Sequence, residues 1–391
     1  MDTFIIGSAC THFGKHPNKS FKQLTREAFE AVINDARLDD GDAIESIYFA
    51  NVKMDMFEQS NIRGQVCFMD LVHEKKVPDR TPIINVEGAC ASGSLALHGA
   101  WKEILAGGKL SLAIGVEKTF IPEDAERQYK LFTGGEDRLN PEQWDDYFTE
   151  IGKRIGKPWG RNAGGGTLNM DTYAMQAAYH MTKYGTTQRQ FAAAASKDHH
   201  HGSLNPLAQY RFEASIDEVL QDRLISYPLT RAMCAPIGDG AAAALVCSAD
   251  FLAGLPRAVQ ERAVKIRACA LGGGRYRDPD EMSNSHVTAR RAYNMAGVVP
   301  DDIDLAELHD ARSYGEIHQA EMLGFCEVGK GGDFAESGAS SLGGKLPINV
   351  SGGLVSKGHP VGATGLSMIY ELSLQLRDEA GSRQVEGAQA G

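Results

Sequence analysis

Two stretches that lie far apart in the chain share one pattern, and this repetition constrains the fold more than any other feature. Pro-Ile-Ile-Asn-Val at 82–86 precedes a glycine-containing loop and an apolar helical segment, and Pro-Ile-Asn-Val at 347–350 does the same. The helical pattern of 21–37 likewise resembles that of 287–297, and a pair of aspartates follows each. A weak duplication of this kind predicts two similar βα units packed together.

The remaining pattern indicates an α/β protein. Short apolar strand patterns at 4–7, 44–49 and 110–116 alternate with helical patterns. Such alternation favours parallel or mixed sheets that are buried between helices. We expect a first unit over residues 1–250 and a second unit over residues 251–391.

An insertion interrupts the first unit at about residues 120–236. Glycine pairs and prolines break the regular spacing there, and two helical patterns follow at 173–183 and 188–197. A buried-strand pattern then resumes at 237–247. We expect this insertion to be carried on the first unit and to cover a site.

The net charge of −11 limits the partners of the chain. An acidic protein does not attract nucleic acid or an anionic membrane surface, so we expect neither partner. The first residues lack a basic signal-peptide region, and no apolar run is long enough to span a bilayer. Seven scattered cysteines without a Cys-x-x-Cys pair argue against disulfides and structural zinc. We therefore expect a cytoplasmic protein that holds no metal.

Three consecutive histidines, His199–His201, do not change this expectation. Successive side chains of a helix point about 100° apart, so the three rings cannot converge on one ion.

Cys90 lies where the buried strand at 82–86 gives way, through a glycine turn, to an apolar helix. Unpaired N–H groups at a helix start carry positive partial charge, which favours the thiolate, the nucleophilic form of cysteine. The competing interpretation is a small buried cysteine that fills space beside alanine and glycine. This stretch alone does not separate the two.

The second unit has a matching loop at 349–365, which contains His359. If the two units are related by pseudo-symmetry, His359 faces Cys90 across their interface, where an imidazole can take the thiol proton. Gly358 and Gly362 permit close approach of the backbone to a ligand. Taken by itself, His359 better fits a surface histidine with no partner.

A third polar group stands at the end of the strand pattern 305–309. His309 and Asp310 precede a helical pattern there, and polar residues at such strand ends are natural members of a site. His309 could donate to a developing oxyanion, directly or through water. The alternative is an ordinary helix start with Asp310 as its cap.

Five motifs now combine into a resemblance. The chain contains, in this order, GACASG at 88–93, AIGVEK at 113–118, PIGDGAAA at 236–243, HD at 309–310, and GG followed by GHPVGATG within 352–365. The series resembles the thiolases over nearly the whole chain, and it is most similar to the sterol-carrier-protein type, in which His-Asp replaces Asn-Glu. The resemblance implies two βαβαβαββ half-domains stacked in five layers, with an inserted loop domain over a coenzyme A site.

The resemblance also implies an acyltransferase chemistry. Cys90 would accept the acyl group of a 3-ketoacyl-CoA as a thioester, His359 would activate Cys90 and help to form an oxyanion hole, and His309 would polarise a carbonyl oxygen or a water. Free coenzyme A would then remove the acyl group.

Coenzyme A is a substrate in this scheme, and the resemblance assigns contacts with it to Gly353, Ser356 and Gly358. Lys153 and Arg154 fit a solvated face better than a contact with a coenzyme A phosphate. The resemblance further implies a homodimer.

Two departures from the family pattern concern the second catalytic cysteine. Classical thiolases carry it in a C-terminal Cys-x-Gly loop, and the sterol-carrier type carries it directly after His-Asp. Here Ala311 occupies the latter position, and the chain ends at Gly391 before the loop and the last strands are expected. Water, a histidine, the substrate or another chain would have to move this proton, because Cys326 better fits a core residue.

The short C-terminus is similar to that of thiolase-like subunits that work with a small zinc-ribbon/OB-fold partner protein, among them a benzoylsuccinyl-CoA thiolase. Arg312 would suit a substrate with an extra carboxylate, such as a succinyl-type acyl-CoA, and the alternatives are an ordinary surface charge or a structural ion pair. We therefore expect a thiolase acting on an aromatic or dicarboxylic acyl-CoA. A retro-aldolase on the same scaffold and a non-catalytic scaffold subunit are the competing functions.

Overall fold

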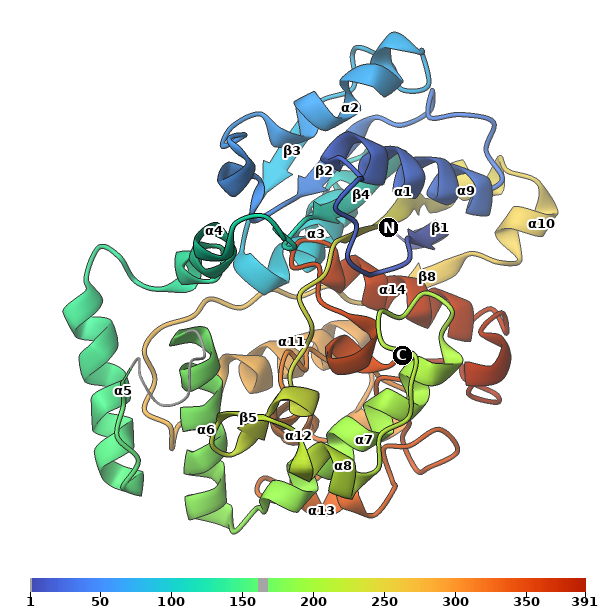
Figure 1. Ribbon diagram of the computed structural model, residues 1–391. Helices are drawn as coiled ribbons and strands as arrows, with labels where there is room; N and C mark the ends of the chain where they lie inside the picture. Colours follow the sequence, from blue (N-terminus) through green and yellow to red (C-terminus); the bar gives the residue numbers. More distant parts are fainter. Residues whose placement is uncertain (1, 161–167) are drawn as a thin grey trace.

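A six-stranded mixed sheet organises the first half of the computed structural model, which describes residues 2–160 and 168–391. The strand order is β3-β2-β4-β7-β1-β8 (Figure 1). β2 is parallel to β3 and β4, whereas β7 is antiparallel to β4 and β1. The strands are β1 (Thr3–Cys10), β2 (Ser46–Ala50), β3 (Ile83–Val86), β4 (Leu110–Glu117), β7 (Gly240–Ser248) and β8 (Val264–Ile266). With the helices that separate the first four, the strands β1, β2, β3, β4 and β7 follow the expected βαβαβαββ order, and the insertion lies between β4 and β7.

Helices cover both faces of this sheet. α1 (Phe21–Asp35) and α2 (Arg63–His73) pack on one face, and α3 (Ser92–Leu105) and α14 (Thr364–Gln375) pack on the other. α1 begins at a capping box formed by Ser20 and Gln23, and its buried stripe includes Leu24, Ala28 and Val32. Because the two faces are covered, every residue of β4 and β7 is buried.

α14 belongs to the second half of the chain but lies beside α3, in contact with the first sheet (Figure 1). Ala242 and Ala244 of β7 face this helix, and their small side chains let it approach closely. Ala363 and Leu366 join Ala96 and Ala100 of α3 in one buried cluster. The two halves of the chain therefore share this helical layer, while the division into two similar units stays a prediction.

The second half repeats the helix order of the first but not its full sheet. α11 (Asn284–Ala296), α12 (Ser313–Met322) and α14 follow in turn. In the described residues, the strands expected at 305–309 and 347–350 are reduced to one parallel bridge between Ala306 and Ile348. The reason is local: Asn349 has a φ of 55°, which turns the chain out of the strand, and its side-chain oxygen accepts from the Leu308 N–H instead.

The insertion is largely helical. It contains α4 (Ala125–Lys130), α5 (Pro141–Ile155), α6 (Leu168–Tyr184), α7 (Gln188–Leu204), α8 (Ile216–Gln221) and the hairpin β5 (Leu224–Ser226) and β6 (Leu229–Thr230). α7 is longer than expected and is buried along most of its length. It packs on α12 and α13 (Gly331–Glu336), so this part of the insertion lies in the core of the second half and does not merely cover a site.

Short helices complete the chain. They are α9 (Ala249–Ala253), α10 (Arg257–Gln260), the 3-10 turns η1 (Met54–Phe57), η2 (Ala89–Ala91), η3 (Thr133–Gly135), η4 (Arg231–Met233), η5 (Pro300–Asp302) and η7 (Gly381–Arg383), and the π-helical turn η6 (Gly353–Lys357). Within the described residues, no helix combines the length and apolar character needed to cross a membrane.

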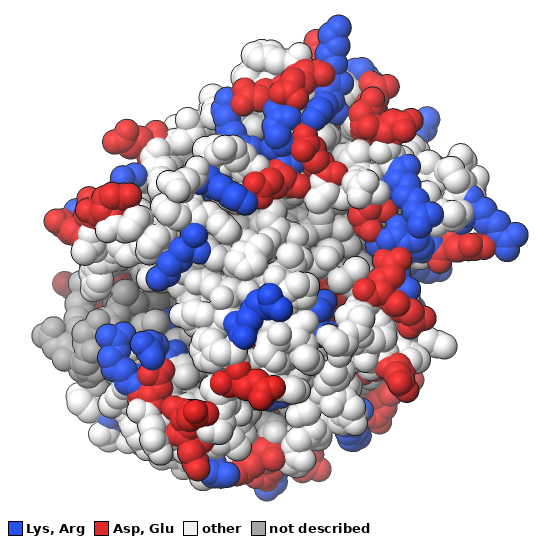
Figure 2. Space-filling view, turned by 45° about the vertical axis from the view of Figure 1, so that its right-hand side comes forward, with Lys and Arg blue, Asp and Glu red and all other residues white. Residues whose placement is uncertain are grey.

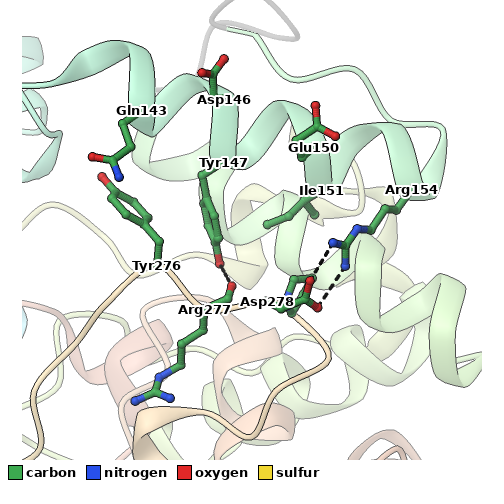
Figure 3. A pocket seen from close by; sticks show the side chains of 10 residues that line it. Gln143, Asp146, Tyr147, Glu150, Ile151, Arg154, Tyr276, Arg277 and Asp278 are labelled. Carbon is green, nitrogen blue, oxygen red and sulfur yellow. Dashed lines mark hydrogen bonds and ion pairs between the residues drawn. The ribbon is translucent and has the colours of Figure 1, made fainter.

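Charged side chains are interspersed on the face shown in Figure 2, where acidic and basic groups surround a largely uncharged centre. A groove of about 380 Å³ lies between α5 and residues 276–279. The Arg154 guanidinium forms a bidentate ion pair with Asp278 in this groove, with N···O distances of 2.7 and 3.0 Å. The Tyr147 hydroxyl donates to the Arg277 carbonyl, and Figure 3 shows both contacts. Arg154 therefore holds α5 in place, although its side chain is exposed as expected.

We predict that Gly115→Ala destabilises the junction between the halves. A Cβ at Gly115 would lie 2.2 Å from the Gly362 carbonyl oxygen, so α14 and its preceding loop would have to move. The unfolding free energy, measured by urea denaturation, should fall by about 1–3 kcal/mol. Gly273→Ala is the matched control, because a Cβ there meets nothing within 4 Å. Equal stability of the two variants would contradict the prediction.

Candidate active site

Cys90 lies in η2, immediately before α3, and is half-buried. The turn is strained, because Ala89 has a φ of 49°, a region that residues with a Cβ seldom adopt. The Ser92 hydroxyl fixes it by accepting from the Gly88 N–H at 2.9 Å and donating to the Ala89 carbonyl at 2.7 Å. Cys90 is thereby held at the junction of β3 and α3, as the sequence indicated.

His359 meets Cys90 across the two halves. Its Nε2 lies 3.3 Å from the Cys90 Sγ, so the predicted meeting of the two loops is confirmed. Its Nδ1 lies 2.7 Å from the Thr364 hydroxyl, which itself donates to the Pro360 carbonyl at 3.0 Å. A hydroxyl has one proton to give, so while Thr364 donates to the Pro360 carbonyl it accepts from Nδ1–H, and we assign this tautomer to His359. The free lone pair of the imidazole therefore points at the thiol.

Burial keeps this pair neutral at rest. It raises the pKa of the Cys90 thiol, although the Arg312 and Lys53 charges act in the opposite direction. It also lowers the pKa of His359 well below the usual value, helped by His309 and Arg312. Both pKa shifts disfavour a thiolate–imidazolium pair. The thiol proton therefore moves to Nε2 only as the sulfur attacks an electrophilic carbon.

His309 completes the cluster. Its ring packs edge-on against His359, with centroids 5.4 Å apart, and donor atoms of Cys90, His309 and His359 lie within 4.8 Å of one another. Its Nε2 is buried and has no hydrogen-bond partner among the described residues. Burial, with the Arg312 charge, lowers the pKa of His309 to about 4, so the ring is neutral at pH 7. An unpaired buried nitrogen is costly unless a ligand satisfies it.

Asp310 is not an exposed helix cap. It is fully buried, and its carboxylate accepts from the Leu354 N–H at 2.7 Å and the Val355 N–H at 3.4 Å, both in η6. It thereby ties the His309 strand end to the loop that carries His359. Asp310 also belongs to a buried acidic cluster with Asp198 and Glu316, in which Lys197 contacts Glu316 at 2.7 Å.

Glu117 belongs to the AIGVEK motif at 113–118, from which no role for its side chain could be predicted. It is fully buried, and its oxygens accept from three backbone N–H groups, those of Val52, Lys53 and Gly362. Burial raises the pKa of Glu117 to about 7. Glu117 thus connects the first sheet to the loop that carries His359. This role depends on the contact with Gly362, which is distant in the chain and cannot be predicted from the sequence.

A cavity of about 570 Å³ opens at the cluster. Residues from both halves and from the insertion line it, including Cys90, His309, Arg312, His359, Lys53, Trp144, Phe148, Tyr173 and Tyr314. Cys90 is the one cysteine among the lining residues that the structure describes. Cys326 instead packs against the cluster around Ala306 and Leu308, which agrees with its interpretation as a core residue.

The three residues expected to contact coenzyme A are not among the described residues that line this cavity. Gly353, Ser356 and Gly358 are buried, and the Ser356 hydroxyl donates to the Tyr210 carbonyl at 2.9 Å. A Cβ at Gly353 would lie 2.3 Å from an Asp310 oxygen, so that glycine is required for the loop to pack. Their contact with coenzyme A stays a prediction.

The three consecutive histidines point to different partners. His199 Nε2 faces the Ala232 carbonyl, His200 faces Glu213, and His201 Nδ1 faces the Asn349 carbonyl, each at 3.0 Å. The glycine run at 164–166 lies outside the described residues.

The chain belongs to the thiolase family. The family model described as thiolase, N-terminal domain matches residues 3–130, and the one described as thiolase C-terminal domain-like matches residues 275–391. An acetyl-CoA acetyltransferase of Methanothermobacter thermautotrophicus is 34% identical over 100% of this chain and 94% of that protein. The chain is accordingly an acyltransferase of this family, and two solved thiolases of similar fold were determined in complex with coenzyme A.

Other relatives extend this comparison. Sterol carrier protein 2 of Oryctolagus cuniculus is 34% identical over 98% of this chain and 68% of that protein. Benzoylsuccinyl-CoA thiolase subunit BbsB of Thauera aromatica is 30% identical over 98% and 91%. Among solved structures, the Ltp2-ChsH2(DUF35) aldolase is similar in fold, with a TM-score of 0.75, 22% identity and coverage of 99% and 92%.

We predict that Thr364→Val lowers kcat/KM about tenfold or more, with most of the loss in kcat. Valine keeps the shape of threonine but cannot accept from Nδ1–H, so the imidazole loses its fixed tautomer and the orientation of its Nε2. Steady-state kinetics with a 3-ketoacyl-CoA measures the effect. Thr364→Ser keeps the hydroxyl and should retain most activity, and equal losses in both variants would refute the tautomer argument.

We predict that the alkylation rate of Cys90 by iodoacetamide keeps rising past pH 9.0, because burial raises the pKa of this thiol above that value. Peptide mass spectrometry of samples taken across the pH range measures the rate. A plateau between pH 6 and 8 would instead indicate a resting thiolate–imidazolium pair.

Proposed function

We propose that this protein cleaves, or in reverse forms, a 3-ketoacyl-CoA by acyl transfer through a thioester on Cys90. The observation that carries the proposal is the 3.3 Å contact between the Cys90 Sγ and the Nε2 of His359. A neutral thiol with a fixed neutral base beside it is the arrangement that nucleophilic acyl transfer needs.

The reaction would proceed in two balanced halves. His359 Nε2 takes the thiol proton as Sγ attacks the 3-keto carbon, the C2–C3 bond breaks, and the electron pair and a proton go to C2 of the departing acetyl-CoA. The thiol of coenzyme A then attacks the thioester and Cys90 regains a proton. His309 would donate from its unpartnered Nε2 to the oxygen that gains charge.

No second cysteine is among the described lining residues, so the proton for C2 needs another carrier. His359, which holds the thiol proton at that moment, can return it directly or through water. This route uses one base for both proton transfers of the first half-reaction.

A retro-aldolase on the same scaffold is the second candidate. It is favoured by the fold similarity to the Ltp2-ChsH2(DUF35) aldolase. That reaction does not need an acyl-cysteine, whereas the Cys90–His359 contact has no evident purpose without one. A non-catalytic scaffold role is disfavoured for the same reason.

We also propose that the protein works as an assembly in the cytoplasm. β3 is an edge strand with half-exposed apolar residues, and Leu105 on the neighbouring α3 is 41% exposed, which supports a homodimer through this edge. The relative BbsB is called a subunit, which supports an assembly with a partner protein, and we propose the small zinc-ribbon/OB-fold partner that the resemblance implies. Free cysteines throughout the described chain suit a reducing compartment.

The acyl-enzyme itself tests the function. Incubation with a 3-ketoacyl-CoA in the absence of free coenzyme A should add the acyl mass to the Cys90 peptide, and added coenzyme A should remove it. Cys90→Ala should lose both the adduct and the thiolase activity. Activity that survives in Cys90→Ala without an adduct would replace the thiolase mechanism with the retro-aldolase.

A further inference from the structure

We propose that Arg312 binds a carboxylate on the acyl group, so that the cavity selects acyl-CoA thioesters whose acyl part carries an acid. The inference deepens the proposed function, because it names a substrate class for the same cavity. It begins with a guanidinium that lines the cavity beside Cys90, His309 and His359.

Arg312 is a buried cation without a counter-charge. Its exposed fraction is 8%, and among residues 2–160 and 168–391 no carboxylate forms an ion pair with it. Its Nε is buried with no hydrogen-bond partner, and its Nη1 donates only to the carbonyl of the adjacent Ala311. The burial of Arg312 therefore excludes the alternative that it is an ordinary surface charge.

The other buried lysine and arginine side chains of the described chain each have a carboxylate partner, which Arg312 lacks. Lys118 lies 3.4 Å from Asp239, Lys197 lies 2.7 Å from Glu316, Lys357 lies 3.3 Å from Glu307, and Arg383 lies 3.1 Å from Glu371. Each has a carboxylate partner within the chain, as buried charges normally do. Arg312 alone among these five residues has none, and it alone faces the substrate cavity.

The surroundings hold Arg312 ready for a planar anion. Its guanidinium lies over the Tyr173 ring, 5.3 Å from the centroid, which offsets part of the cost of burial. It directly precedes α12, so its backbone is fixed by that helix and by a bridge to Cys234. A carboxylate accepts from a guanidinium through two parallel hydrogen bonds, which lysine cannot provide.

The same charge acts on the reacting groups, since Arg312 lowers the pKa values of Cys90, His309 and His359. A substrate carboxylate would neutralise this effect when it binds. Arg312 could instead serve only to tune the thiol, and the two roles differ in their dependence on the acyl group.

Equilibrium binding separates these roles without relying on turnover. Cys90→Ala protein, which cannot be acylated, is titrated by calorimetry with glutaryl-CoA and with pentanoyl-CoA, which have the same chain length and differ in the terminal acid. We expect glutaryl-CoA to bind at least about tenfold more tightly. Adding Arg312→Met should erase this ratio, while Arg312→Lys should retain only part of it.

Equal affinities for the two thioesters in Cys90→Ala would overturn the proposal, as would a preference that persists in Arg312→Met. If the Met variant fails to fold, judged by its circular dichroism and melting temperature, the ratio in Cys90→Ala and the partial loss in Arg312→Lys still decide the matter. Absence of an acyl-Cys90 adduct would reject the proposed function but leave this binding result intact.

Discussion

The catalytic arrangement depends on the close approach of two backbones where the halves of the chain meet. A Cβ at Gly93 would lie 3.1 Å from atoms of Gly362 and Gly365, and one at Gly365 would lie 2.6 Å from the Ser94 nitrogen. The starts of α3 and α14 can therefore touch only because both carry glycine. This contact sets the distance between a cysteine on one helix start and a histidine in the loop before the other. Glu117 and Asp310 then hold the flanking loops through backbone N–H groups.

Burial of polar groups is the second constraint, and it acts differently on each member of the site. Carboxylates that position loops accept several N–H groups, so their burial is compensated. The reacting groups are less well satisfied: His309 keeps a nitrogen without a partner, and the Cys90–His359 pair is held neutral. The site thus keeps its unmet hydrogen-bonding capacity where a substrate would bind, which is how a preorganised site lowers the cost of charge development.

Much of this could be predicted from the sequence. The alternation of strands and helices gave the first sheet, and the matching loops correctly predicted that Cys90 and His359 meet. The reduction of the expected second sheet to a single bridge in the described residues could not be predicted, because the Ile348 strand pattern is cut short by the conformation of Asn349. The role of Glu117 and the isolation of Arg312 were also inaccessible, since both depend on which distant groups are, or are not, nearby. Helix α7 looked like part of a cover, but its buried Lys197 and His201 contact Glu316 and Asn349 of the second half.

The hydrogen bond from His359 to Thr364 has a consequence for the order of events. Because the Nδ1 proton is committed to a hydroxyl whose own proton is committed to a carbonyl, the ring can exchange protons at one edge only. In the proposed reaction, His359 therefore has room for a single proton and must discharge it before the next thiol can be deprotonated. Thr364 would thereby fix the order of the two proton transfers: the proton of Cys90 must reach C2 before His359 can accept the proton of the coenzyme A thiol.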